Sequence, residues 1–154
     1  MKSAAVAGAL TLAPGSIRAA NKASNHIRVG VIGLSRGVAH VRRFAETSGV
    51  DVTYVCDVDE KRIARGTKAL KAGNAKGVTD FRKILEDSEV DVLSIAAPNF
   101  WHAPAAILAM QAGKHVYVEK PGSHNMAEAD MIVAASRKYD KRVQMGNQRR
   151  SYPN

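Results

Sequence analysis

Apolar runs and amphipathic runs alternate along most of this chain. Segments with the character of strands and of helices follow one another over residues 27–33, 36–48, 50–57, 60–70 and 80–87. Parallel strands need a crossover between them, and that crossover is usually a helix. The pattern therefore predicts an α/β fold with a doubly wound, mostly parallel sheet.

The alternation continues in the second half of the chain. Residues 90–97 are almost continuously apolar, as in a strand that helices cover on both faces, and Pro98 ends the run. Helix formers fill residues 105–112, with Pro104 in the first turn and Gly113 as a left-handed stop. Further elements are expected at 114–118 (strand), 129–139 (helix) and 142–146 (strand). Because no Pro/Gly/Ser linker interrupts residues 24–154, we expect them to form a single domain.

Residues 1–23 differ from the rest of the chain. Lys2, an apolar small-residue run over 4–13 and the pair Ala19-Ala20 resemble an export signal. The segment also resembles the tail of a twin-arginine leader that lacks its arginine pair. The prediction is an exported protein of the bacterial periplasm, and the alternative is an apolar N-terminus without a targeting role on a cytoplasmic protein. No segment is long enough to span a bilayer.

Charge alters this interpretation little. The 154 residues carry 23 Lys and Arg against 14 Asp and Glu, a formal net charge of +9. The basic residues are scattered, and the pairs Arg42-Arg43 and Arg149-Arg150 are too short to form a basic arm. We expect solvated helix faces and no nucleic-acid partner; an acidic partner domain is the alternative. The single cysteine, Cys56, is expected to be a small buried hydrophobe, and the five histidines show no metal-binding spacing, so no metal is predicted.

A glycine-bearing turn follows the first strand. In residues 28–37, RVGVIGLSRG, an apolar strand runs into this turn and then into a helix. The turn nominates Gly33, Ser35, Arg36 and Gly37 as cofactor-binding residues. Glycines allow the main chain to approach a pyrophosphate, and the helix that begins near Arg36 would direct N–H groups and its dipole at that anion.

Asp57 stands twenty residues after Gly37, where the second strand ends. A carboxylate at this place accepts hydrogen bonds from the adenosine ribose and repels a 2′-phosphate, which favours NAD over NADP. The alternative role for Asp57 is to form the turn before Asp59.

Taken together, several segments resemble the cofactor domain of the Gfo/Idh/MocA oxidoreductases. The matching motifs are VGVIG, RGxxH, CDVDEKR, APNxxHAP, AGKHVYVEKP and MGNQRR, and they cover residues 24–154. The resemblance implies a Rossmann domain that binds NAD(P). It also implies a second α/β domain, which binds a sugar, polyol or related substrate, and we expect that domain to be absent from this chain.

One departure from the family concerns the glycine turn. The family pattern G-x-G-x-x-G-x-x-H is one residue shorter here, with Ser35 at the middle position between Gly33 and Gly37. A serine side chain adds bulk where the main chain should meet phosphate. The shortened turn could still bind the cofactor through the two glycines and the helix terminus. It could also have lost the ability to bind. His40, at the end of the pattern, is expected to be a surface or packing residue.

The segment Glu119-Lys120-Pro121 follows a strand, and it carries the candidate chemistry. Oxidation of a secondary alcohol requires a group that takes the hydroxyl proton, and the motif assigns this role to Lys120. Partial burial and a neighbouring nicotinamide ring would disfavour its ammonium form. Glu119 is expected to orient Lys120 or contact the cofactor, and Pro121 to fix the turn through a cis peptide bond. The alternative for Lys120 is an exposed charge at a strand end.

Other residues are expected near the cofactor's ribose or nicotinamide. Asn99 and His102 follow the strand at 90–97, although Asn99 is also a candidate helix cap. Gln148 follows the last strand, and Trp101 is expected to pack against the helix or line the cleft.

The leading hypothesis is the nucleotide-binding domain of an NAD-dependent oxidoreductase. Its substrate would be a sugar, polyol or related secondary alcohol that transfers hydride to the cofactor. The alternatives are a non-catalytic dinucleotide-binding module and an inactive fragment, and a homo-oligomer remains open.

Overall fold

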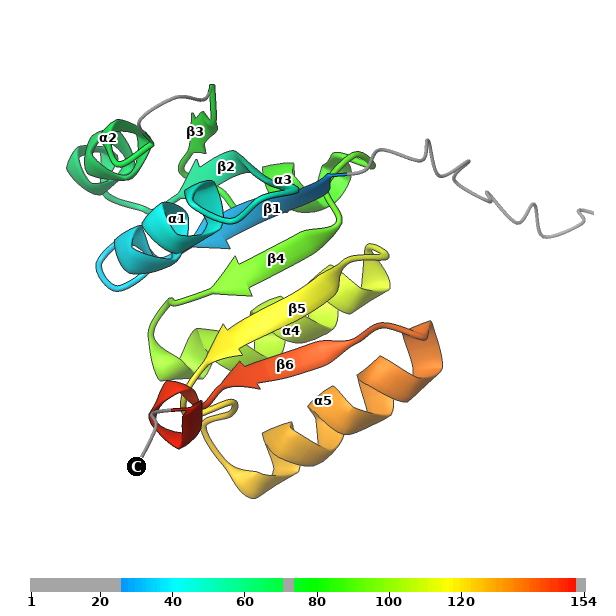
Figure 1. Ribbon diagram of the computed structural model, residues 1–154. Coiled ribbons are helices and arrows are strands. Elements are labelled where there is room, and N and C mark those ends of the chain that lie inside the picture. The colour runs from blue at the N-terminus through cyan, green and yellow to red at the C-terminus, as the bar shows by residue number, and fades with distance from the viewer. Residues whose placement is uncertain (1–25, 71–73, 152–154) are drawn as a thin grey trace, which may run out of the picture.

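A six-stranded, all-parallel sheet forms the centre of the molecule (Figure 1), and its strand order is β3-β2-β1-β4-β5-β6. The computed structural model describes residues 26–70 and 74–151, so the leader predicted over 1–23 lies outside the described residues. The strands are β1 (Ile27–Ile32), β2 (Val50–Cys56), β3 (Lys76–Val78), β4 (Val92–Ile95), β5 (His115–Glu119) and β6 (Val143–Gly146). This is the doubly wound fold that the alternation of segments predicts.

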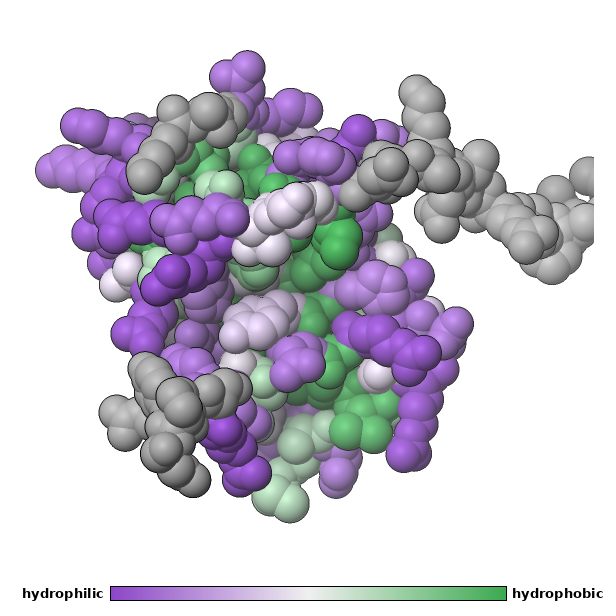
Figure 2. All heavy atoms as spheres, in the orientation of Figure 1, coloured by the Kyte–Doolittle hydropathy of each residue, from purple (hydrophilic) through white to green (hydrophobic). Residues whose placement is uncertain are grey.

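Helices cover the two faces of the sheet. They are α1 (Val38–Ala45), α2 (Glu60–Lys68), α3 (Arg82–Glu86), α4 (His102–Gln111) and α5 (Met126–Tyr139), with short 3-10 turns η1 (Asn99–Trp101) and η2 (Gln148–Ser151). Helices α1 and α2 lie beside β1–β3 on one face, whereas α4 lies behind β5 and packs on α5 (Figure 1). Figure 2 shows hydrophilic residues around the rim and hydrophobic ones gathered over the middle strands.

Each face has its own hydrophobic core. Under α1 and α2 the core contains Val31, Leu34 and Val41, each with no exposed surface. Under α4 and α5 it contains Leu93 and Met110, equally buried. Burial on both faces accounts for the continuous apolar runs in the sequence, because a parallel strand covered by helices has no polar side.

The structure corrects several expected boundaries. The segment 80–87 holds a strand's place in the alternation, yet it contains helix α3, and the strand of this position is the three-residue β3. Helix α1 is shorter than the expected 36–48, whereas α4 begins at His102 and has Pro104 in its first turn, as predicted. Short elements at sheet edges carry few apolar residues, so periodicity identifies them poorly.

The connection from β3 to β4 crosses the sheet, so β1 lies between β2 and β4. After β1 and after β4 the chain turns toward opposite faces of the sheet, and this opens a crevice at the carboxyl ends of these two strands. Open α/β sheets bind ligands in this crevice. The fold thus brings the glycine turn after β1, Asp57 after β2 and the turns after β4 and β5 to a common edge.

Candidate functional site

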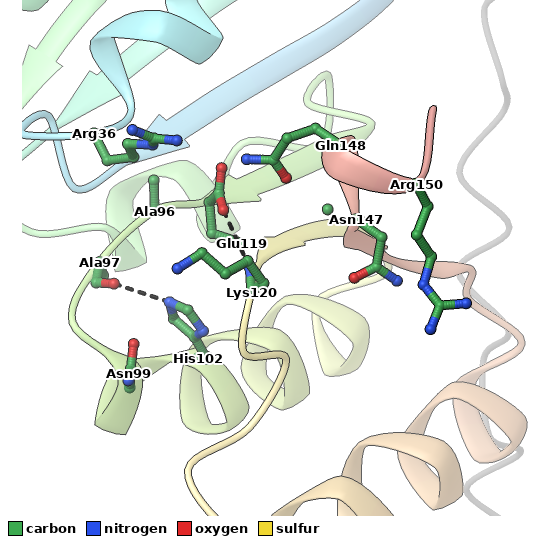
Figure 3. Close-up of a pocket in the computed structure, with 11 residues that line it drawn as sticks. Arg36, Ala96, Ala97, Asn99, His102, Glu119, Lys120, Asn147, Gln148 and Arg150 are labelled. Atoms are coloured by element: carbon green, nitrogen blue, oxygen red, sulfur yellow. Dashed lines mark hydrogen bonds between the residues drawn. The ribbon is translucent and has the colours of Figure 1, made fainter. Parts of the chain in front are cut away.

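An open cavity of about 760 Å³ lies at this carboxyl edge (Figure 3). Six residues that the sequence nominates line it, namely Arg36, Asn99, His102, Glu119, Lys120 and Gln148. The other nominated residues, Gly33, Ser35, Gly37, Asp57 and Pro121, lie outside its lining. Ala96, Ala97, Asn147 and Arg150 line the cavity without having been nominated. The cavity therefore joins the turn before α1 to the ends of β4, β5 and β6.

The glycine turn is packed tightly against the end of β4. Gly33 has φ +82°, and a Cβ atom there would lie 2.5 Å from the main chain of Ala96 and Ala97. A Cβ at Gly37 would lie 2.6 Å from the Gly33 carbonyl oxygen. Both positions therefore exclude side chains. The Gly37 N–H donates to that carbonyl over 2.9 Å, so this amide closes the turn from within.

Ser35 and Arg36 form the exposed tip of the turn, and Arg36 faces the cavity. The turn is held from α2, where Arg65 donates from Nη2 to the carbonyl oxygens of Leu34 and Ser35 over 2.9 and 3.4 Å. Arg65 escaped the sequence analysis because its role is a contact between distant segments. The shortened turn thus has a defined conformation with Ser35 pointing outward.

Asp57 fastens the same turn from the end of β2. This buried carboxylate accepts at Oδ2 from the Leu34 N–H over 2.7 Å and at Oδ1 from the Asp59 N–H over 3.1 Å. Arg62 Nη1 lies 3.8 Å from Asp57 Oδ2. The bond to Asp59 agrees with the turn-forming role. Each carboxylate oxygen has a second lone pair, which leaves acceptor capacity for a ribose hydroxyl.

His102 holds the turn that follows β5. Its side chain is 1% exposed, with Nδ1 2.5 Å from the Pro121 carbonyl oxygen and Nε2 2.9 Å from the Ala97 carbonyl oxygen (Figure 3). Both ring nitrogens thus face main-chain carbonyls. The Lys120-Pro121 peptide bond is cis, as the resemblance implies. His102 therefore ties this turn to the end of β4 and presents no ring nitrogen to a cofactor.

Lys120 reaches into the cavity from the end of β5 (Figure 3). Among residues 26–70 and 74–151 its Nζ has no hydrogen-bond or ion-pair partner, and the residue is exposed. The partial burial expected for Lys120 in the presence of a cofactor stays a prediction. An unpaired amine on the wall of a cavity is available to a ligand.

Glu119 lies beside Lys120 and is 6% exposed. Its Oε2 accepts from the Lys120 N–H over 3.2 Å, and its Oε1 lies 3.0 Å from His40 Nε2. Burial raises the pKa of the Glu119 carboxyl, but hydrogen bonds from His40 and Lys120 and the charge of Arg36 outweigh it, so the pKa lies below its ordinary value. The cavity wall consequently carries a carboxylate at neutral pH.

The rim of the cavity comes from the turns after β4 and β6. Asn99 is exposed in η1, and no side chain caps the start of α4, so the capping role considered for Asn99 is wrong. Trp101 packs edge-on against Phe81, with ring centroids 5.9 Å apart, and does not line the cavity. Gln148 in η2 closes the cavity opposite Arg36 (Figure 3).

The described residues contain no group of three or more His, Cys, Asp or Glu side chains placed to hold a metal ion. Among the same residues, no helix is both long and apolar enough to cross a membrane.

A parallel sheet in the order 321456, a glycine turn that excludes side chains and a cavity at the switch point together define a dinucleotide-binding Rossmann domain. Residues 27–147 match the Gfo/Idh/MocA family model, described as "Oxidoreductase family, NAD-binding Rossmann fold". The chain belongs to this family, whose members bind NAD(P).

Individual relatives match over the same domain. The chain is 37% identical over 127 residues to inositol 2-dehydrogenase of Salmonella typhimurium, covering 80% of this chain and 38% of that protein. It is 38% identical over 112 residues to glycosyl hydrolase family 109 protein 2 of Shewanella sp. (strain ANA-3), and the match covers 68% of this chain and 25% of that protein. The WlbA dehydrogenase of Bordetella pertussis, solved with NADH and UDP-GlcNAcA, superposes with TM-score 0.74 at 25% identity, covering 81% and 36%. The chain thus spans between a quarter and two fifths of these relatives.

Proposed function

We propose that this chain is the nucleotide-binding part of an NAD-dependent oxidoreductase that acts on a sugar, polyol or related secondary alcohol. The observation that carries the proposal is the Lys120 side chain, which has no partner among the described residues and lies on a cavity at the switch point of a NAD(P)-binding family fold. NAD supplies the hydride acceptor when it is bound. The proposal concerns the enzyme that contains this domain, because relatives are longer than this chain.

Lys120 is the acid/base group of the proposed reaction. Its Nζ in the neutral form takes the hydroxyl proton of the substrate as the carbon loses hydride. A positive nicotinamide ring and a substrate that cover the exposed side chain would both disfavour the ammonium form. Glu119 and His102 act on the main chain around Lys120 and set where the amine lies.

Asp57 supports a preference for NAD over NADP. Its buried carboxylate places negative charge at the end of β2, where a 2′-phosphate would be repelled. The Arg62 guanidinium, 3.8 Å away, offsets part of that charge, so we expect a preference of about tenfold rather than complete exclusion of NADP.

The relatives support the proposed substrate class. One is named inositol 2-dehydrogenase, and another is solved with a nucleotide sugar. A second candidate is cleavage of a glycosidic bond, which the relative named as a glycosyl hydrolase favours. Both candidates place a carbohydrate next to Lys120. The third candidate function is a domain that binds NAD(H) without catalysing a reaction.

We also propose that the protein is exported to the bacterial periplasm, which the composition of residues 1–23 supports. The intact mass of the protein from its native source tests this proposal. We expect a mass lower than that of the uncleaved protein by the mass of the residues up to about Ala20. An unprocessed N-terminus would contradict the proposed export.

NADH fluorescence titration of this chain, followed by turnover assays of the enzyme that contains the domain, tests the function. We expect NADH to bind more tightly than NADPH, and Lys120→Ala to bind NADH unchanged. The same substitution should reduce oxidation of a polyol or nucleotide sugar at least a hundredfold, because general acid–base catalysis contributes about 10²–10⁴.

The matched control is Lys83→Ala, an exposed lysine on α3 that is paired with Glu86 away from the cavity. It should change neither binding nor turnover. Persistent turnover in Lys120→Ala would refute the acid/base role. Release of sugar from a glycoside without net reduction of NAD would favour the glycosidase, and NADH binding without either reaction would favour the non-catalytic module.

A further inference from the structure

His40 occupies an unusual position between the two halves of the site. It lies in α1, shortly after the glycine turn, and its side chain is 12% exposed. Its Nδ1 lies 2.9 Å from Ser94 Oγ in β4, and its Nε2 lies 3.0 Å from Glu119 Oε1 at the end of β5. The rings of Phe44 and Tyr117 meet it edge-on, with centroids 6.3 and 5.5 Å away. The imidazole is thus held in one orientation.

The partners determine where the ring proton must lie. An ionised carboxylate only accepts hydrogen bonds, so His40 Nε2 carries the proton and donates it to Glu119. In the neutral ring Nδ1 is then an acceptor, and the fully buried Ser94 hydroxyl donates to it. This Nε2–H tautomer satisfies all three polar groups without placing an unpaired donor or acceptor in the interior.

The interaction continues from Glu119 to the candidate acid/base residue. The second oxygen of Glu119, Oε2, accepts from the Lys120 N–H over 3.2 Å. A continuous series of hydrogen bonds therefore runs from Ser94 through His40 and Glu119 to the main chain of Lys120. A residue that only filled space would need the two aromatic contacts and neither of these polar ones.

We propose that His40 is a positioning residue of the oxidoreductase site, which aims the Glu119 carboxylate and thereby fixes the main chain that carries Lys120. This inference rests on the proposed function. The expectation that His40 is a surface or packing residue allows for its aromatic contacts and omits its polar ones. Its position also joins the helix of the glycine turn to the turn of the reactive lysine.

The charge state of Glu119 should report the loss of this contact. The groups that face Glu119 are His40 on α1, Arg36 in the preceding turn, Tyr117 on β5 and the adjacent Lys120. Burial raises the pKa of this carboxyl, and the hydrogen bond from His40 is the leading opposing contribution. Without the hydrogen bond from His40, the effect of burial is less opposed. The pKa of the Glu119 carboxyl should therefore rise.

The first experiment follows the Glu119 carboxyl by ¹³C NMR in the full chain, with Glu119→Gln to assign its signal. In the wild type the carboxyl should titrate below the ordinary value of 4.5. His40→Ala should raise its midpoint, and His40→Gln, whose amide can still donate, should restore part of the shift. His124→Gln changes an exposed histidine outside the cavity lining and is the matched control. An unchanged Glu119 midpoint in folded His40→Ala would overturn the proposal.

A measurement on the wild type keeps the proposal testable if His40→Ala fails to fold. Long-range ¹H–¹⁵N NMR of the imidazole should show the Nε2–H tautomer at neutral pH, and an Nδ1–H tautomer would overturn the proposal. Neither NMR measurement involves a cofactor, so they separate failure of this inference from failure of the proposed function. In turnover assays of the enzyme that contains this domain, His40→Ala should lower kcat roughly tenfold and His40→Gln less, as expected for loss of a hydrogen bond to a charged group, while NADH affinity stays unchanged.

Discussion

The two halves of the candidate site differ in how closely their main chains are packed, although buried polar side chains such as Asp57 and His102 hold the turns of both. In the half formed by β1, α1 and β2, the glycine turn packs directly against the end of β4, and Gly33 and Gly37 leave no room for a Cβ atom. In the half formed by β4 and β5, buried polar side chains hold the main chain in place, chiefly His102 and Glu119. Substitutions that add atoms should therefore destabilise the first half. Substitutions that remove atoms should destabilise the second.

The largest effect should come from His102→Ala in the second half. The substitution leaves a cavity at a side chain that is 1% exposed and removes the ring nitrogens that lie 2.5 and 2.9 Å from two main-chain carbonyl oxygens. We expect a loss of about 4 kcal/mol in the free energy of unfolding. Urea denaturation measures it, and Asn99→Ala, an exposed residue of the same connection, should cost less than about 0.5 kcal/mol. Similar losses in the two variants would contradict the holding role of His102.

Gly33→Ala tests the first half by adding one methyl group. Its φ of +82° disfavours alanine, and the new Cβ would lie 2.5 Å from the main chain of Ala96. We expect a loss of about 3 kcal/mol from strain and crowding together. Gly113→Ala separates the two causes, because Gly113 has φ +80° with no atom within 4 Å of a Cβ, and should lose only about 1 kcal/mol. Equal losses would mean that crowding at Gly33 contributes nothing.

A smaller effect is expected at the opposite edge of the sheet, away from the site. There Tyr54 donates to Asp87 Oδ2 over 2.8 Å. The pKa of Asp87 lies below 3.8 mainly because it accepts from the Glu89 N–H, with burial opposing and the Tyr54 hydroxyl assisting. A depressed carboxyl pKa stabilises the fold above the unfolded-state value, and this stabilisation disappears as the pH falls through the folded-state value.

Tyr54→Phe should therefore cost about 1 kcal/mol at pH 7 and progressively less below pH about 4. Urea denaturation at both pH values measures the difference. NADH affinity should stay unchanged, since this edge has no contact with the cavity at the carboxyl ends. A loss of stability that does not vary with pH would show that the Tyr54 hydroxyl does not act through the Asp87 carboxylate.

The sequence predicted the fold better than the boundaries of its elements. A continuous apolar run identified β4, because this strand is covered on two faces and its burial leaves a clear pattern. The segment 80–87 was misjudged, because α3 has only five residues and β3 only three. Such short elements owe their structure to the sheet edge beside them rather than to their own periodicity.

The sequence predicted part of the candidate site. It nominated Lys120, Glu119 and Gln148, which line one cavity, because each follows a strand and all strands end at the same edge. It did not nominate Arg65, and it treated His40 only as a helix-surface or packing residue. The partner of Arg65 lies about 30 residues away in the chain, and the partners of His40 lie between 50 and 80 residues away. No local sequence pattern indicates such contacts.

The amino-acid sequence by itself determined the class of fold, the family and the edge of the sheet where the reactive groups lie. These follow from local properties, namely apolar runs, glycines at a turn and motifs placed after strands. Only the tertiary structure decided the roles of individual polar groups: Asp57 fastening the turn, His102 holding two carbonyls and His40 aiming Glu119. A hydrogen bond depends on distance and direction between groups that the fold alone brings together, so it leaves no periodic signal in the chain.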